Sequence, residues 1–133
     1  MAVKIRRTIL CVEDEAIALI ARKMVLERQG YRVLTAHDAG SALDLFTHQT
    51  VDLVVTDHLL RGITGTEIAA EMKRLKPFVP IVVLSGATEK PKDIGHADLF
   101  VSKTEEVEAV LAKVAALLDR NINSVPAGTN LYC

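Results

Sequence analysis

Cysteine, net charge and long apolar runs are all scarce in this chain of 133 residues. Its two cysteines, Cys11 and Cys133, are too few for a disulfide framework. A formal net charge of −1 gives no electrostatic reason to expect nucleic acid or an anionic membrane as a direct partner. The sequence also has no apolar run long enough to cross a bilayer or to serve as a signal peptide. We therefore expect a location in the reducing cytoplasm.

The composition that remains is that of an ordinary globular domain. Hydrophobic residues make up 50% of the chain and charged residues 25%. Its length suits one domain with a substantial core. Beyond residue 120 the sequence is polar and has no helical period, which indicates a loose terminus, or alternatively a strap over a neighbouring surface. We predict one domain over residues 1–120 and a tail over 121–133.

Short, β-branched, apolar stretches alternate with helical patterns along the chain. They predict buried strands over residues 8–12, 32–36, 51–56, 80–84 and 98–102. Helical periodicity predicts helices over residues 15–29, 39–48, 65–75 and 104–119. Near-continuous apolar strands that alternate with helices predict an α/β fold, in which helices cover both faces of a parallel sheet.

The helix ends and apolar faces can also be predicted. We expect Gly30 to end the first helix, Asp38 to cap the second, and a capping box from Thr64 to Glu67 to open the third. In the first helix the apolar face that we expect to be buried is Ile17, Ile20, Ala21, Met24 and Val25. In the last helix it is Val107, Val110, Leu111, Val114 and Leu118.

Functional groups follow four of the predicted strands. They are the acidic pair Glu13 and Asp14, then Asp57, Ser85 and Lys103. In open α/β sheets the carboxyl ends of parallel strands form the ligand-binding edge, so we expect these groups to converge. Three converging carboxylates would repel each other unless a cation joined them, and hard divalent cations such as Mg²⁺ prefer oxygen ligands. One carboxylate, Asp57, could then attack a phosphoryl group, whose oxygens Lys103 and Ser85 would bind.

Taken together, these segments resemble the response-regulator receiver domain, the phosphoacceptor module of two-component signalling. The resemblance covers residues 8–119 and is carried by residues 9–15, 51–57, 62–67, 81–86 and 98–103. It implies a flavodoxin-like, doubly wound sheet of five parallel strands in the order 2-1-3-4-5.

The resemblance also implies a role for each matching residue. Asp57 would be the phosphoacceptor, and the Mg²⁺ ligands would be Glu13, Asp14, Asp57 and the backbone carbonyl of Leu59. The phosphate-binding and switch residues would be Ser85, Gly86, Lys103 and Phe100. In the family, phosphorylation draws the hydroxyl inward and the aromatic ring follows it, which changes the partner preference of the outer surface.

Among the departures of the sequence from the family pattern, two lead to structural predictions. Thr104 stands where the family usually has a proline after a cis bond, and a cis bond before a non-proline residue costs about 3–4 kcal/mol. We therefore predict a trans Lys103–Thr104 bond, with Thr104 as a helix cap. The segment between Ser85 and Lys103 is about one helical turn shorter than usual, so we expect the family's fourth helix to be shortened or irregular.

Three functions are compatible with the sequence. The favoured one is a stand-alone receiver that accepts phosphate from a histidine kinase or a phosphotransfer protein and signals by contact with a downstream protein, with a homodimer possible. It would not be a turnover enzyme. The second is a degenerate receiver that acts as a phosphorylation-independent interaction module. The third, a metal-dependent phosphohydrolase, would need a general acid or base near Asp57, for which His58 is the only nearby candidate, although an exposed loop position is the expected setting of His58.

Overall fold

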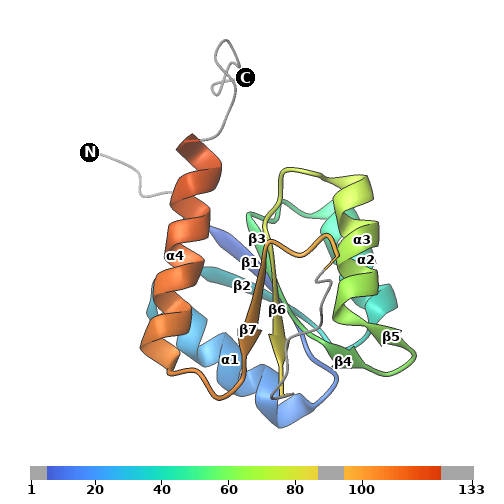
Figure 1. Ribbon diagram of the computed structural model, residues 1–133, viewed down its shortest axis with the longest axis horizontal. Helices are drawn as coiled ribbons and strands as arrows, with labels where there is room; N and C mark the ends of the chain where they lie inside the picture. Colours follow the sequence, from blue (N-terminus) through green and yellow to red (C-terminus); the bar gives the residue numbers. More distant parts are fainter. Residues whose placement is uncertain (1–5, 87–94, 124–133) are drawn as a thin grey trace.

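Five parallel strands form the central sheet of this computed structural model, which describes residues 6–86 and 95–123 (Figure 1). The strands are β1 (Thr8–Val12), β2 (Arg32–Ala36), β3 (Leu53–Asp57), β6 (Ile81–Ser85) and β7 (Leu99–Ser102). They pair in the order β2-β1-β3-β6-β7, which is the predicted order once a small hairpin, β4 (Leu59–Leu60) with β5 (Ile63–Thr64), is set aside. The predicted fold class is therefore confirmed.

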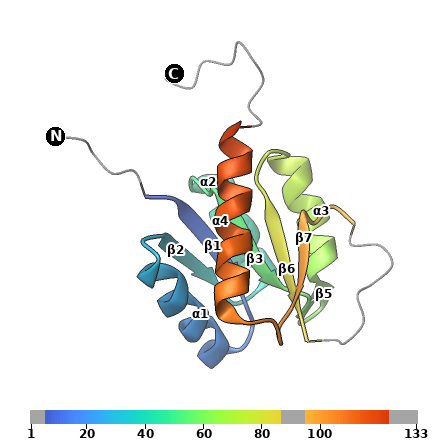
Figure 2. The ribbon, with the colours of Figure 1, turned by 60° about the vertical axis from the view of Figure 1, so that its left-hand side comes forward.

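Helices cover both faces of the sheet, as Figure 2 shows. On one face α2 (Ala39–His48) and α3 (Gly65–Leu75) enclose a core around Phe46, Ile68 and Met72. On the other, α1 (Ala16–Arg28) and α4 (Val107–Asn123) pack over alternate residues of the same strands. Each strand contributes side chains to both cores because successive residues point to opposite faces. For the described residues, none of the helices is long and apolar enough to span a membrane.

Local signals in the sequence place most helix ends correctly. Asp38 Oδ1 accepts a hydrogen bond from the Ser41 backbone N–H at 2.7 Å, which caps α2 as predicted. Thr64 Oγ1 accepts one from the Glu67 N–H at 3.2 Å and opens α3. Gly30, with φ of +96°, follows the last residues of α1. α4 continues to Asn123, three residues past the predicted end of the domain. The boundary at residue 120 stays a prediction.

The predicted buried face of α1 is wrong. Ile17, Ile20 and Met24 are 77%, 59% and 49% exposed, whereas Leu26 is the buried residue of the helix. The reason is that residues 16–21 are all apolar. Helical periodicity therefore fits more than one apolar face and does not show which of them is buried. In α4, Val114 and Leu118 are buried as predicted, but Val107 at its first turn is exposed.

The start of the last helix also differs from the prediction. α4 begins at Val107, and Thr104 is not its cap. Instead the Thr104 backbone N–H donates to Ser102 Oγ at 3.2 Å in a turn that precedes the helix. The expectation of a shortened fourth helix concerns residues 87–94, which lie outside the described residues, and the described positions beside them, 86 and 95–98, carry no helix.

Candidate functional site

The carboxyl ends of four neighbouring strands bring the predicted groups together at one edge of the sheet. Glu13 and Asp14 follow β1, Asp57 ends β3, Ser85 ends β6, and Lys103 follows β7. A hydrogen bond joins two of these strand ends, because the Lys103 backbone N–H donates to the Ser85 carbonyl at 2.8 Å. The convergence expected from the sequence is present because the parallel register places these residues side by side.

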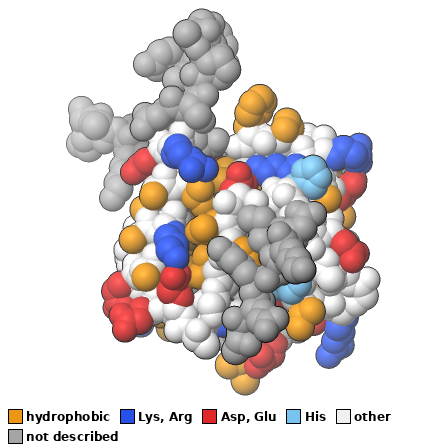
Figure 3. Space-filling model, in the orientation of Figure 1, with side chains coloured by type: hydrophobic (Ala, Val, Ile, Leu, Met, Phe, Trp, Pro, Cys, Tyr) orange, Lys and Arg blue, Asp and Glu red, His pale blue; other side chains and the backbone are white. Residues whose placement is uncertain are grey.

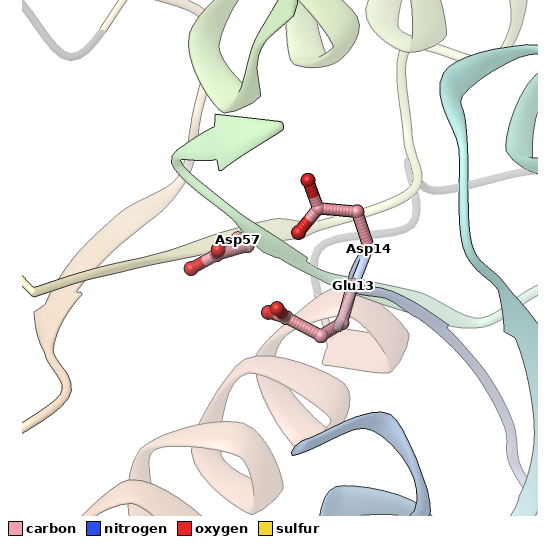
Figure 4. A group of neighbouring side chains, drawn as sticks. All are labelled: Glu13, Asp14 and Asp57. Atoms are coloured by element: carbon pink, nitrogen blue, oxygen red, sulfur yellow. The ribbon is translucent and has the colours of Figure 1, made fainter. Parts of the chain in front are cut away.

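Three carboxylates form the centre of this edge. One oxygen from each of Glu13, Asp14 and Asp57 lies within 4.8 Å of the others, and the side chains point into one common space (Figure 4). Glu13 and Asp57 are buried, at 2% and 5% exposure, and Asp14 is partly exposed. Such a set of oxygen donors fits a hard divalent cation such as Mg²⁺.

Two basic side chains contact the buried carboxylates. Lys103 Nζ lies 2.6 Å from Asp57 Oδ1. Arg22 Nη1, from the middle of α1, lies 2.7 Å from Glu13 Oε2. The place of Lys103 after a strand predicts its role, but no prediction from the sequence includes Arg22. The signal available was weak, because a charged residue in the middle of a helix is ordinarily solvent-exposed.

The pKa of Glu13 is subject to opposing effects. Burial raises the pKa of Glu13 above its usual value, and the neighbouring Asp57 carboxylate raises it further. The Arg22 guanidinium and the hydrogen bond from the Glu15 backbone N–H, at 3.2 Å from Oε1, act in the opposite direction. Beneath the site, burial raises the pKa of the Cys11 thiol to about 12, so this cysteine is a neutral core residue.

The hairpin after Asp57 orients a backbone carbonyl. The Gly65 N–H donates to the His58 carbonyl at 2.6 Å, which makes His58 and Gly65 a hydrogen-bonded pair. Pairs alternate along an antiparallel ladder, so the next one, Leu59 and Thr64, is a non-hydrogen-bonded pair. The ladder therefore leaves the Leu59 carbonyl unused, as a metal ligand at this position requires.

Gly65 fits closely against the end of β3. A Cβ atom at this position would lie 2.6 Å from the Asp57 carbonyl oxygen and 3.0 Å from the His58 Cα. Backbone atoms at these distances cannot move aside as the tip of a flexible side chain can. Glycine at position 65 thus allows α3 to begin directly against the strand that carries Asp57. The hairpin turn uses a second glycine, Gly62, with φ of +77°.

The aromatic and hydroxyl groups beside Asp57 are buried. Ser85 and Phe100 are 4% and 6% exposed. The His58 ring meets Phe100 edge-on, with the ring centroids 5.2 Å apart. His58 Nδ1 is buried and has no hydrogen-bond partner within residues 6–86 and 95–123. The expectation of an exposed loop histidine is therefore wrong, because the ring packs inward on Phe100.

The remaining site residues lie at the rim. The Lys103–Thr104 peptide bond is trans, as predicted. Gly86 follows β6, and a Cβ there would be in ordinary contact with Lys103 Cδ, at 3.8 Å.

A groove of about 280 Å³ opens between α1 and α4, and Arg22 and Lys103 both line it. Hydrophobic side chains are visible alongside α4, bordered by charged ones (Figure 3).

Comparison with known proteins gives a consistent result. The model of the response regulator receiver domain family matches residues 9–115. The chain is 32% identical over 125 residues to the alkaline phosphatase synthesis transcriptional regulatory protein PhoP of Bacillus subtilis, covering 91% of this chain and 52% of PhoP. It is 31% identical over 118 residues to the uncharacterized transcriptional regulatory protein YkoG of the same organism, covering 85% of this chain and 51% of YkoG. The chain thus spans about half the length of these curated relatives.

Solved structures show the same architecture. A CheY-like response regulator receiver domain protein from Methanospirillum hungatei superposes with a TM-score of 0.83 at 26% identity, over 90% of this chain and 99% of that one. The response regulator TrrA from Thermotoga maritima, solved in complex with Mg²⁺ and BeF, superposes with a TM-score of 0.79 at 31% identity, over 84% of this chain and 98% of that one.

Proposed function

The chain belongs to the family of response regulator receiver domains, and we propose that Asp57 is the residue on which it accepts a phosphoryl group. Receiver domains are phosphoacceptors of two-component signalling. The observation that carries the assignment to Asp57 is its setting: a buried carboxylate at the end of β3, with the Lys103 ammonium at 2.6 Å on one side and the Glu13–Asp14 pair on the other. We propose a histidine kinase or a phosphotransfer protein as the donor.

The chemistry follows from these neighbours. An Asp57 oxygen attacks the phosphorus atom, the bond between phosphorus and the donor nitrogen breaks, and an acyl phosphate forms on Asp57. Lys103 binds the oxygens of the incoming group, and its contact with Asp57 holds the amine where they arrive. Bound by Glu13, Asp14, Asp57 and the Leu59 carbonyl, Mg²⁺ would neutralise charge on the transferred group.

We further propose that Ser85 and Phe100 transmit the phosphorylation signal, with Gly86 leaving space for the phosphoryl group. Phe100 already lies buried against His58. Because the ring is already buried, we propose that phosphorylation stabilises this position rather than creating it. The output would be contact with a downstream protein, made by this chain alone or as a homodimer; a longer protein with a further domain is the form of the curated relatives.

Incubation of the protein with Mg²⁺ and a small phosphodonor tests the proposed function. We expect one phosphoryl group per chain, mapped by mass spectrometry to the peptide that contains Asp57 and sensitive to hydroxylamine, as acyl phosphates are. Release of phosphate with no phosphoryl group detectable on the chain would support the phosphohydrolase. An unlabelled, folded protein would support the phosphorylation-independent interaction module.

The exposed apolar side chains of α1 give a second prediction. A donor that brings a phosphohistidine to Asp57 must contact the elements beside it, and Ile17 and Ile20 are exposed in the first turns after Asp14. We expect Ile20→Ser to slow transfer from a phosphohistidine protein about tenfold, the scale of one lost apolar contact at the centre of an interface. Labelling by a small phosphodonor should be unchanged, since that donor needs no docking surface.

The matched control for this prediction is Phe78→Ser. Phe78 is as exposed as Ile17, at 77%, but follows α3 at the opposite edge of the sheet. It should leave both labelling rates unchanged. Equal slowing with the small donor and the protein donor in Ile20→Ser would show damage to the site itself and would count against α1 as the docking surface.

A further inference from the structure

Arg22 occupies an unusual place for a charged residue of α1. Its side chain is 19% exposed, and its guanidinium lies against Glu13 rather than in solvent. The residue also lines the groove between α1 and α4, where Val25 and Val110 are among its apolar neighbours. The aliphatic part of such a side chain packs on apolar surface, and its guanidinium pairs with a buried carboxylate. Both contacts hold it in one position.

Both oxygens of the Glu13 carboxylate are engaged before any ion binds. Oε2 accepts the hydrogen bond from Arg22 at 2.7 Å, and Oε1 accepts one from the Glu15 N–H at 3.2 Å. These contacts fix the carboxylate in the direction of Asp14 and Asp57. Within residues 6–86 and 95–123, Asp14 forms no ion pair, so its negative charge is the one of the three that no basic side chain balances.

The three carboxylates therefore face two built-in cations, Arg22 on Glu13 and Lys103 on Asp57. A divalent ion that enters this space is attracted by the carboxylates and repelled by both basic side chains. Because it carries two charges, each of these interaction energies is twice that of a monovalent ion. Lys103 also has a part in phosphoryl binding. Arg22 contacts Glu13, on the α1 side of the cluster, rather than the proposed phosphoacceptor Asp57.

We propose that Arg22 is a positioning residue for Glu13 that lowers the affinity of the carboxylate site for its divalent cation. The inference rests on the proposed metal site. The readiness of Asp57 to accept a phosphoryl group then depends on how strongly the site holds its ion as well as on the donor.

Direct ion binding tests the proposal without reference to phosphorylation. Mn²⁺ binding is followed by electron paramagnetic resonance, and Mg²⁺ affinity is obtained from its displacement of Mn²⁺, at constant pH and ionic strength. We expect Arg22→Gln to raise the affinity about tenfold, the size expected for removal of one unit charge near a divalent ion at a water-accessible rim. Arg22→Lys keeps the charge and should stay within about twofold of the parent protein.

Two further variants keep the experiment decisive. Arg22→Met retains an unbranched stem for the groove and serves if Arg22→Gln does not fold; its affinity should rise by the same factor. Arg74→Gln removes the same charge from an exposed pair with Glu71 near the far end of α3, and should leave the affinity unchanged.

The outcomes separate the inference from the metal site on which it rests. An unchanged or weaker affinity in folded Arg22→Gln and Arg22→Met, with clear binding by the parent protein, overturns the role of Arg22 and leaves the site intact. If neither the parent protein nor the variants bind the ion, both are overturned. A rise in all three charge-removing variants, Arg74→Gln included, would reflect net charge and also overturn the role of Arg22.

Discussion

Asp57→Ala is expected to abolish phosphoryl labelling by a small phosphodonor, down to background. The carboxylate is the only part of residue 57 that can attack phosphorus, and alanine has no group to replace it. Glu13 is not expected to substitute for it, because its carboxylate pairs with Arg22 and lacks the contact with the Lys103 amine that Asp57 makes. Labelling is measured by intact-mass spectrometry after incubation with Mg²⁺.

The same variant should remain folded. Removal of one of three clustered carboxylates relieves repulsion, and Lys103, whose side chain is 36% exposed, can turn its ammonium to solvent. We therefore expect urea unfolding to give a free energy of unfolding no lower than that of the parent protein. Asp44→Ala, which removes an exposed carboxylate of α2, is the control and should keep full labelling. Labelling of Asp57→Ala at the parental level would place the acceptor elsewhere.

Gly65→Ala is expected to lower the free energy of unfolding by about 1–3 kcal/mol, the usual cost of forcing extra volume into a well-packed region. The added Cβ would lie 2.6 Å from the Asp57 carbonyl oxygen and 3.1 Å from Val83 Cγ1. Relief requires α3 or the backbone at Asp57 to shift, and a shift at Asp57 would move its carboxylate relative to Lys103. Labelling should therefore slow together with the loss of stability seen in urea unfolding.

A second glycine provides the matched control. Gly40 lies in the first turn of α2, where a Cβ would meet only Asp38 Oδ1, at 3.5 Å. Because alanine is favoured over glycine in a helix, Gly40→Ala should be as stable as the parent protein or more stable by up to about 1 kcal/mol. If Gly65→Ala matched the parent protein in both stability and labelling, the close approach at Gly65 would have no energetic importance.

Short-range patterns account for the parts of the fold that the sequence predicted well. The strands β1 and β2 were placed to the residue, because each is a compact apolar stretch bounded by polar or turn residues. Asp38 and Thr64 were placed as caps because the hydrogen bond they make spans three residues. The convergence of Asp57, Ser85 and Lys103 followed from one rule of parallel sheets.

The errors lie where more than one local answer was available. Thr104 could cap a helix, but its hydroxyl lies 2.7 Å from Ser102 Oγ in a turn, and α4 begins three residues later. His58 could extend into solvent, but Phe100 offers it an aromatic edge contact. Phe100 lies in β7, far from His58 in the chain, so no local pattern encodes that contact. Ser102 is two residues from Thr104, and there two local hydrogen-bonding patterns competed.

By itself the sequence determined the alternation of strands and helices and the chemical groups at the strand ends, because those follow from periodicity and from the residues that terminate each run. Only the tertiary structure decided which side of α1 faces the sheet, since residues 16–21 are apolar all round. That rotation exposes Ile17 and Ile20 and turns Arg22 onto Glu13, nine residues away in the chain. Asp57 and its acidic partners could be read from the sequence; the second cation beside them came from the packing of a helix.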